Sequence, residues 1–142
     1  MKKQSFLILL GLIFTLFSGF RPTNTSRLKV EVSGLDSRSS TQVWVSVFSQ
    51  DAFLETPLES KSTSGKAGKV YVEFDLPPGE YAISTYHDTN NNDKLDRHFY
   101  GKPKEPYGFS NNVTPRFGPP KYDACKFELG SSAKTISITL ID

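Results

Sequence analysis

Cysteine is almost absent from this sequence of 142 residues: Cys125 is its one cysteine, so no disulfide can form within the chain. A surplus of positive charge is absent as well. The 17 lysines and arginines stand against 15 aspartates and glutamates, and two of the lysines, Lys2 and Lys3, lie in an N-terminal segment that we expect to be removed. Proteins that neutralise nucleic-acid phosphates need such a surplus. The balanced charge therefore argues against a nucleic-acid-binding protein.

The longest apolar run, residues 6–17, follows these two lysines, which is the layout of a secretory signal peptide. A membrane-spanning helix needs roughly 20 apolar residues. We therefore predict a signal peptide over residues 1–20, with an N-terminal anchor helix as the alternative. We expect cleavage within residues 18–26, where no cysteine could accept a lipid. The mature protein is then expected to be soluble, without a stable membrane span, and periplasmic or secreted.

Beyond residue 25, apolar and polar residues alternate, which is the period of half-buried strands. No segment offers a helix long enough to cross over a parallel sheet. We therefore predict one all-β domain over residues 26–142, an antiparallel immunoglobulin-like or transthyretin-like sandwich of about seven strands. One core between the two sheets is expected to hold Val30, Val45, Val72, Ile83, Phe127 and Ile138. The clearest strands are predicted at 28–32, 43–48, 69–76, 80–87, 125–129 and 136–140.

Turn chemistry separates these segments. Two prolines cannot donate to a ladder, so Pro77-Pro78-Gly79 predicts a turn that joins strands 69–76 and 80–87 into a hairpin. Further breaks are predicted at 34–40, 62–68 and 130–133. One segment, 51–61, could carry a helical turn.

The single cysteine also belongs to an alternating segment. Cys125 alternates with Phe127 and Leu129, which predicts an inward-facing strand position. A thiol becomes reactive when a basic partner and solvent access favour its thiolate. We therefore expect a buried, unreactive thiol.

Residues 88–123 form a stretch of about 36 residues without a strand pattern. Loops of that length inside a domain are usually functional or disordered. This one is rich in tyrosine, phenylalanine and proline, which favour an ordered segment because aromatic groups stabilise when packed and prolines lower the entropy of ordering. We predict a long ordered crossover on the sandwich.

The crossover begins with oxygen-bearing residues at the spacing of a calcium loop. Asp93 stands where such loops carry glycine, and Phe99 stands where they carry a bidentate glutamate. The alternative is a turn whose side chains cap its own backbone. The candidate calcium ligands are Asp88, Asn90, Asn92, Lys94 (through its carbonyl) and Asp96.

Several motifs resemble the bacterial secreted family catalogued as domain of unknown function 2141. They are Leu-Pro-Pro-Gly-Glu-Tyr-Ala at 76–82, Tyr-His-Asp at 86–88, Glu-Pro-Tyr-Gly-Phe-Ser-Asn-Asn at 105–112 and Gly-Pro-Pro at 118–120. The similarity extends over about residues 28–140. It implies a β-sandwich and export in a Gram-negative bacterium, and it supplies no substrate, cofactor or catalytic residue.

We therefore expect an exported, non-enzymatic binding or structural module whose crossover is the recognition surface, because loops on rigid sandwiches commonly carry recognition. Its partner would be a protein or glycan of the cell envelope or the extracellular space. The alternative is a small secreted hydrolase that uses His87 or His98 with Asp88, Asp96 or Glu105. The predicted binding surface comprises Tyr100, Tyr107, Phe109, Asn111 and Asn112.

Overall fold

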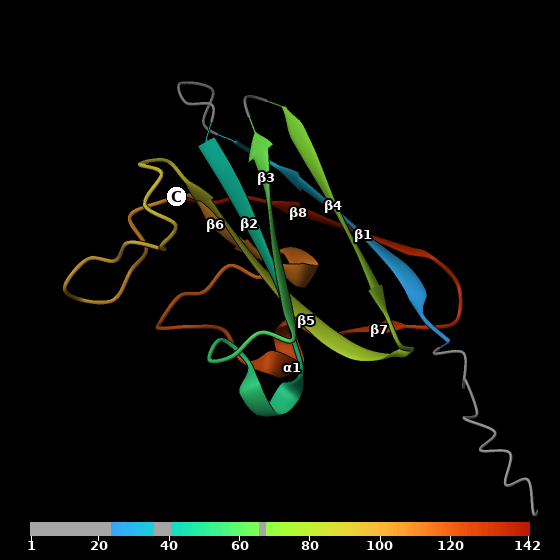
Figure 1. Ribbon diagram of the computed structural model, residues 1–142. Coiled ribbons are helices and arrows are strands. Elements are labelled where there is room, and N and C mark those ends of the chain that lie inside the picture. Colours follow the sequence, from blue (N-terminus) through green and yellow to red (C-terminus); the bar gives the residue numbers. More distant parts are fainter. Residues whose placement is uncertain (1–23, 36–40, 66–67) are drawn as a thin grey trace, which may run out of the picture.

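The computed structural model describes residues 24–35, 41–65 and 68–142. The predicted signal peptide and most of its cleavage window lie outside these residues. The described chain forms two packed β-sheets, which confirms the all-β sandwich (Figure 1). The strands are β1 (Ser26–Ser33), β2 (Thr41–Phe48), β3 (Glu59–Gly65), β4 (Lys69–Leu76), β5 (Gly79–Asp88), β6 (Tyr107–Phe109), β7 (Phe127–Leu129) and β8 (Lys134–Thr139). Three short helical turns accompany them: η1 (Gln50–Ala52), η2 (Ser110–Asn112) and α1 (Tyr122–Cys125).

One sheet has the strand order β4-β1-β8, and the other has the order β3-β2-β5-β6, with β7 also pairing with β5. β2 lies between β3 and β5, a central position that fits the apolar residues on both faces of segment 43–48. The pairings are antiparallel except that of β1 with β8, which is parallel. The predicted antiparallel arrangement therefore holds for the other strand pairs and fails at this one. The first and last strands need no crossover helix because the whole intervening domain connects them.

The core lies between the two sheets and is built from the alternating residues. All six predicted core positions belong to one buried cluster: Val30, Val45, Val72, Ile83, Phe127 and Ile138. The sandwich is also closed at one side by β6, because Tyr107 exchanges backbone hydrogen bonds of 2.9 and 2.8 Å with Ile141, just beyond β8. Gly108 is required there: a Cβ on it would lie 2.7 Å from the Cγ2 of Ile138.

The predicted hairpin of strands 69–76 and 80–87 is wrong. β4 pairs with β1, whereas β5 pairs with β2, β6 and β7 in the other sheet. Pro77 and Pro78 thus carry the chain from one sheet to the other, and the hydroxyl of Tyr81 donates to the carbonyl oxygen of Pro77 at 2.8 Å. A proline turn breaks the ladder in either arrangement. The two strands belong to different sheets, and both contribute side chains to the core between them.

The predicted break at 62–68 is also wrong over most of its length, because β3 extends to Gly65. Its sequence, Glu-Ser-Lys-Ser-Thr-Ser-Gly, shows little apolar alternation because β3 is an exposed edge strand. Pairing with β2 holds it, with a hydroxyl contact of 2.7 Å between Ser46 and Ser60. The helical turn expected in 51–61 corresponds to η1 at its start.

Two further expectations need correction. Cys125 lies at the end of the short helix α1, not on a strand, although it is fully buried as predicted. The crossover does contain a strand, β6, which has three residues and is therefore too short to show alternation. The described chain thus has eight strands where about seven were predicted.

The register of the last strand can be tested with Ile138→Ala. The Ile138 side chain is 1% exposed in the core, so we expect its truncation to lower the free energy of unfolding by about 2 to 5 kcal/mol. Ser137, its outward-facing neighbour, supplies the matched control: Ser137→Ala is expected to change stability by about 0.5 kcal/mol or less. Urea unfolding measures both. A loss below about 1 kcal/mol for Ile138→Ala would contradict the register.

Candidate functional site

The five-stranded sheet is covered on its outer face by the crossover. A second buried cluster forms there, separate from the main core, from Ala82 of β5, Tyr107 and Phe109 of β6, and Tyr122 and Cys125 of α1. Burial raises the pKa of the Cys125 thiol to about 11, which fits the expectation of an unreactive cysteine. The predicted long crossover is therefore ordered and packed against the sheet.

Ser110 fixes the middle of the crossover. Its side chain is fully buried, accepts the backbone N–H of Ile83 at 2.9 Å and donates to the carbonyl oxygen of Cys125 at 2.5 Å. One hydroxyl thus joins β5, η2 and the end of α1. Ser110 satisfies backbone groups that would otherwise be buried without partners, and this accounts for its position without a catalytic role.

Asn111 and Asn112, which were predicted to belong to a binding surface, both have positive φ angles, 62° and 51°. The Asn111 amide donates to the carbonyl oxygens of Ala124 and Lys126 at 3.0 and 2.9 Å. The Asn112 amide accepts the backbone N–H of Thr139 at 2.8 Å and donates to the carbonyl oxygen of Ser137 at 3.3 Å, as a neighbouring strand would. Both amides are therefore engaged in holding the crossover to α1 and to the edge of β8.

The segment 88–96, here called the acidic turn, begins at the last residue of β5. Asp88 holds the backbone of this turn through hydrogen bonds. The Asp88 side chain is fully buried, and its two oxygens accept the backbone N–H groups of Asn92 at 3.1 Å and Asp93 at 2.7 Å. Glu105, 4% exposed, reaches back to the same turn and accepts the N–H groups of Thr89 at 2.9 Å and Asp96 at 3.1 Å. Two buried carboxylates thus bind four backbone donors of one turn.

The remaining predicted calcium ligands also meet in this turn. One oxygen of Asp96 accepts the side-chain amides of Asn90 at 2.6 Å and Asn92 at 2.9 Å. The backbone N–H of Lys94 donates to the side-chain oxygen of Asn92 at 2.9 Å. This is the self-capping pattern that stood as the alternative. In the described part of the chain, no three His, Cys, Asp or Glu side chains are grouped so as to hold a metal ion.

The two histidines of the hydrolase alternative lie apart in different surroundings. His87 is fully buried on the core side of β5, and its Nε2 lies 2.7 Å from the hydroxyl oxygen of Thr41. His98 is exposed and stacks on Tyr100, with 5.0 Å between ring centroids. The carboxylates of Asp88 and Glu105 are occupied by the backbone of the turn. These groups do not converge in one solvent-reached cleft.

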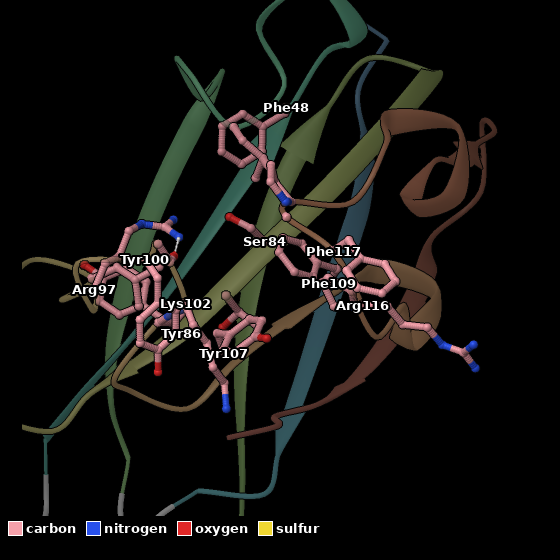
Figure 2. Close-up of a pocket in the computed structure, with 18 residues that line it drawn as sticks. Phe48, Ser84, Tyr86, Arg97, Tyr100, Lys102, Tyr107, Phe109, Arg116 and Phe117 are labelled. Carbon is pink, nitrogen blue, oxygen red and sulfur yellow. Dashed lines mark hydrogen bonds between the residues drawn. The ribbon is translucent and has the colours of Figure 1, made fainter.

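A groove of about 840 Å³ lies on the outer face of the five-stranded sheet (Figure 2). Its floor is formed by β5 and β6, and two segments of the crossover, around 95–103 and 115–119, line its sides. Its aromatic lining comprises Phe48, Tyr86, Tyr100, Tyr107, Phe109 and Phe117. Of the predicted surface residues, Tyr100, Tyr107 and Phe109 line this groove, whereas Asn111 and Asn112 do not.

The sequence prediction did not include the charged residues of the groove. Arg97, Lys102 and Arg116 line it, and the described residues of the lining include no aspartate or glutamate. Arg97 and Lys102 lie on one side near Tyr86 and Tyr100, and Arg116 lies with Phe117 on the other (Figure 2). Residues 97–103 fold as a hairpin that is closed by the bridge between Arg97 and Pro103. This hairpin brings Arg97 and Lys102 to the groove beside Tyr100. In the sequence, the only sign of this arrangement is that the two cations lie close to Tyr100 on either side.

A β-sandwich with an ordered crossover and a groove beneath it is the class of protein that this fold defines. A family model described as an uncharacterized protein conserved in bacteria (DUF2141) matches residues 30–137. The chain belongs to this family, as the sequence motifs indicated. No curated protein and no solved structure matches the chain significantly. In the described residues, no helix is long and apolar enough to cross a membrane.

Tyr86 connects the groove to the acidic turn electrostatically. Burial, and secondarily the negative charges of Asp88, Glu105 and Asp93, raise the pKa of the Tyr86 hydroxyl to about 12. An unfolded chain ionises its tyrosines near pH 10. The neutral form is therefore favoured in the folded protein, and the stability that this provides is present below about pH 10 and is lost as the pH rises towards about 12.

Tyr86→Phe tests this assignment because phenylalanine removes the ionisable hydroxyl. We expect the free energy of unfolding of the wild-type protein to fall more steeply between about pH 9 and about pH 11 than that of the variant. Urea unfolding at several pH values measures the difference, and the two proteins at about pH 8 provide the baseline. Equal slopes in the two proteins would contradict the raised pKa.

Proposed function

We propose that this chain is an exported, non-enzymatic binding module that recognises a component of the cell envelope or of the extracellular space through the groove under its crossover. The groove supports this proposal: it combines aromatic side chains with three cations on a rigid sheet. Concave, largely apolar sites with a few polar groups are typical of ligand binding. Export is inferred from the N-terminal sequence pattern, and the bacterial family is consistent with it.

Binding is favoured over hydrolysis by the separation of the titratable groups. A hydrolase of the kind considered would need an imidazole and a carboxylate within hydrogen-bond reach at the substrate. Neither His87 nor His98 lines the groove, and neither do Asp88, Asp96 or Glu105. The groups that do line it can bind and orient a ligand through contact and charge.

Capture of partners from a cell-envelope extract tests the recognition surface. The double variant Tyr100→Ala with Phe117→Ala removes two exposed aromatic groups from the groove, 62% and 98% exposed, so it should leave the fold unchanged and abolish capture. Tyr71→Ala is the matched control, since Tyr71 is also exposed, at 49%, but lies on β4 in the other sheet. The exported protein used as bait should have an intact mass without residues 1–17. Capture that survives the double variant, or is lost equally in Tyr71→Ala, would contradict the proposal.

We also propose that the acidic turn takes up calcium weakly. Asp88 and Asp96 contribute carboxylates to one turn, and Asn90 and Asn92 contribute amides that now donate to Asp96. A calcium ion would replace these amide hydrogens as the partner of the Asp96 carboxylate, with amide and backbone oxygens completing its shell. Two charged ligands suit a modest affinity, with Kd about 10⁻⁴ to 10⁻³ M, as in extracellular modules.

Thermal unfolding in calcium and in chelator tests this second proposal. Calcium at about 100 times its Kd should add about 2.7 kcal/mol to the stability of the folded state and raise the melting temperature. Asp96→Asn retains the side-chain size but removes one charged ligand, so it should abolish the shift, whereas the distant Asp123→Asn should retain it. Identical wild-type melting curves in both conditions would leave self-capping as the whole role of the turn.

A further inference from the structure

We propose that the ligand of the groove is an anionic amphiphile: a single acyl chain, or a similar apolar body, that carries a carboxylate or phosphate head group. This inference rests on the proposed function and names the chemical class that the groove selects. Three features of the lining point to it: its unpaired positive charge, its apolar floor and its lack of carboxylate and amide acceptors.

The positive charge of the groove is not neutralised within the protein. Within residues 24–35, 41–65 and 68–142, neither Arg97, Lys102 nor Arg116 forms an ion pair with a carboxylate. Arg97 makes one hydrogen bond, at 3.0 Å, to the carbonyl oxygen of Gly101 in its own turn. The nearby carboxylates of the acidic turn are occupied by backbone and amide donors.

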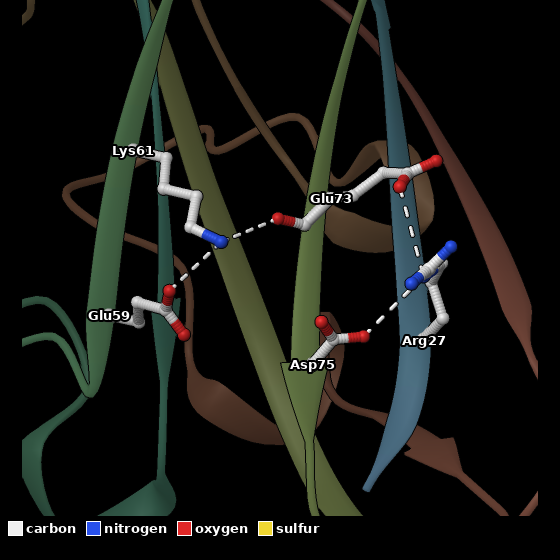
Figure 3. A network of polar contacts seen from close by, with 5 residues as sticks. All are labelled: Arg27, Glu59, Lys61, Glu73 and Asp75. Atoms are coloured by element: carbon white, nitrogen blue, oxygen red, sulfur yellow. Dashed lines mark hydrogen bonds and ion pairs between the residues drawn. The ribbon is translucent and has the colours of Figure 1, made fainter.

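Two cations outside the groove, Lys61 and Arg27, have carboxylate partners (Figure 3). Lys61 of β3 lies 3.0 Å from Glu59 and donates to the carbonyl oxygen of Glu73 at 2.7 Å. Arg27 of β1 lies 3.4 Å from Asp75 and 3.8 Å from Glu73. Arg27 and Lys61 thus have carboxylate partners, whereas the exposed Lys134 of β8 and the three groove cations have none within the described residues. The groove differs from an isolated lysine because three cations line one surface that no acidic side chain of the described residues lines, which is the electrostatic complement of an anion.

The floor of the groove suits an apolar body. Phe48 and Leu54 come from the end of β2 and the following turn, and Tyr107 and Phe109 come from β6. Leu95, Pro103, Pro115 and Pro119 add apolar walls. The volume of about 840 Å³ lies in the range of pockets that enclose most of a small ligand. An acyl chain laid on this floor would remove apolar surface from water on both partners.

The polar groups of the groove favour an acceptor-only head group over a sugar. Arginine and lysine donate hydrogen bonds and cannot accept them. The described lining contains no Asp, Glu, Asn, Gln or His, so its side-chain acceptors are hydroxyl groups alone: those of Ser84, Thr85, Tyr86, Tyr100 and Tyr107. The Thr85 hydroxyl already donates to the carbonyl oxygen of Trp44 at 2.7 Å. A sugar presents several hydroxyl groups that donate as well as accept, and this lining offers them no carboxylate or amide oxygen as an acceptor. A carboxylate or phosphate needs donors alone, which this lining supplies.

The exposed aromatic rings at the mouth complete the argument. Phe117 is 98% exposed and Tyr100 is 62% exposed, on opposite sides of the groove (Figure 2). Tyr100 lies at the tip of the hairpin 97–103, beside Phe99, which is fully exposed. Large aromatic groups left in water at the rim of a cleft mark an interaction site. Here they would cover the chain of the amphiphile once its head has met the cations.

Isothermal titration calorimetry with dodecyl phosphate, kept below its micelle concentration, tests the proposal on the mature protein. We expect saturable binding with one ligand per protein. Dodecyltrimethylammonium, which has the same chain and the opposite charge, should bind at least about tenfold more weakly, and inorganic phosphate should not bind measurably. Equal affinity for the cationic and anionic amphiphiles would overturn the proposal.

Variants locate the binding in the groove. Lys102→Gln combined with Arg97→Gln should weaken dodecyl phosphate binding about tenfold, because two charge-assisted contacts to the head are lost. Lys134→Gln on β8 is the matched control, since Lys134 is an exposed lysine of the other sheet, and it should bind as the wild type does. An unchanged affinity in the double variant, with an unchanged melting temperature, would place the amphiphile elsewhere and overturn the proposal.

Two further arms separate this inference from the proposed function. Binding to vesicles of anionic phospholipid without binding of monomeric dodecyl phosphate would make the surface a membrane contact and overturn the inference. Binding of an acidic oligosaccharide in place of the amphiphile would also overturn it. If the binding to vesicles or to the oligosaccharide is lost in the double variant Tyr100→Ala with Phe117→Ala, the groove is still the recognition surface. In that case only the proposed class of ligand is wrong.

Discussion

The burial of both faces of β5 is the constraint on which the rest of the structure depends. On one face Tyr81 and Ile83 belong to the core between the sheets, and on the other face Ala82 belongs to the second cluster under the crossover. A sheet covered on one side would leave that second face in water. In a chain that cannot form an internal disulfide, apolar contact must hold the crossover in place.

Several features follow from this two-sided burial. The crossover must return to the sheet after Asp88, so it contributes β6 as a neighbour of β5 and places Tyr107 and Phe109 against the outer face. It must also satisfy its own backbone while it does so. Ser110, Asn111 and Asn112 achieve this with side chains that bind main-chain groups of β5, α1 and β8. Serine and asparagine suit these positions because their side chains are short and polar and can bind nearby backbone groups.

The alternation of apolar and polar residues correctly predicted which side chains point into the core. It did not predict which strands pair with each other. The six core positions were correct because a strand with one buried face fixes which side chains point inward. The partner of each strand is a long-range property, so the Pro77-Pro78 turn could not distinguish a hairpin from a passage between sheets. β3 was missed because a strand at an exposed edge needs few apolar residues, and β6 was missed because three residues carry no period.

The candidate site was predicted in its local parts only. The convergence of Asp88, Asn92 and Asp96 follows from their spacing in one turn. Glu105 reaches that turn because the chain folds back after the hairpin 97–103. The groove is formed by residues from distant segments, such as Phe48, Arg97 and Phe117, which come together only in the folded protein. A pattern within one segment of the sequence cannot predict that these distant residues meet.

The acidic turn supports one side of the groove, because its hydrogen bonds hold the hairpin 97–103 that lines the groove. Glu105 accepts the N–H groups of Thr89 and Asp96, and the N–H of Lys104 donates to the carbonyl oxygen of Asp96 at 2.9 Å. These bonds close the base of the hairpin whose Arg97, Tyr100 and Lys102 line the groove. The buried carboxylates therefore set the position of the cations although they do not enter the groove themselves. Negative charge is used in this region to order the backbone, which leaves the positive charge of the hairpin available to a ligand.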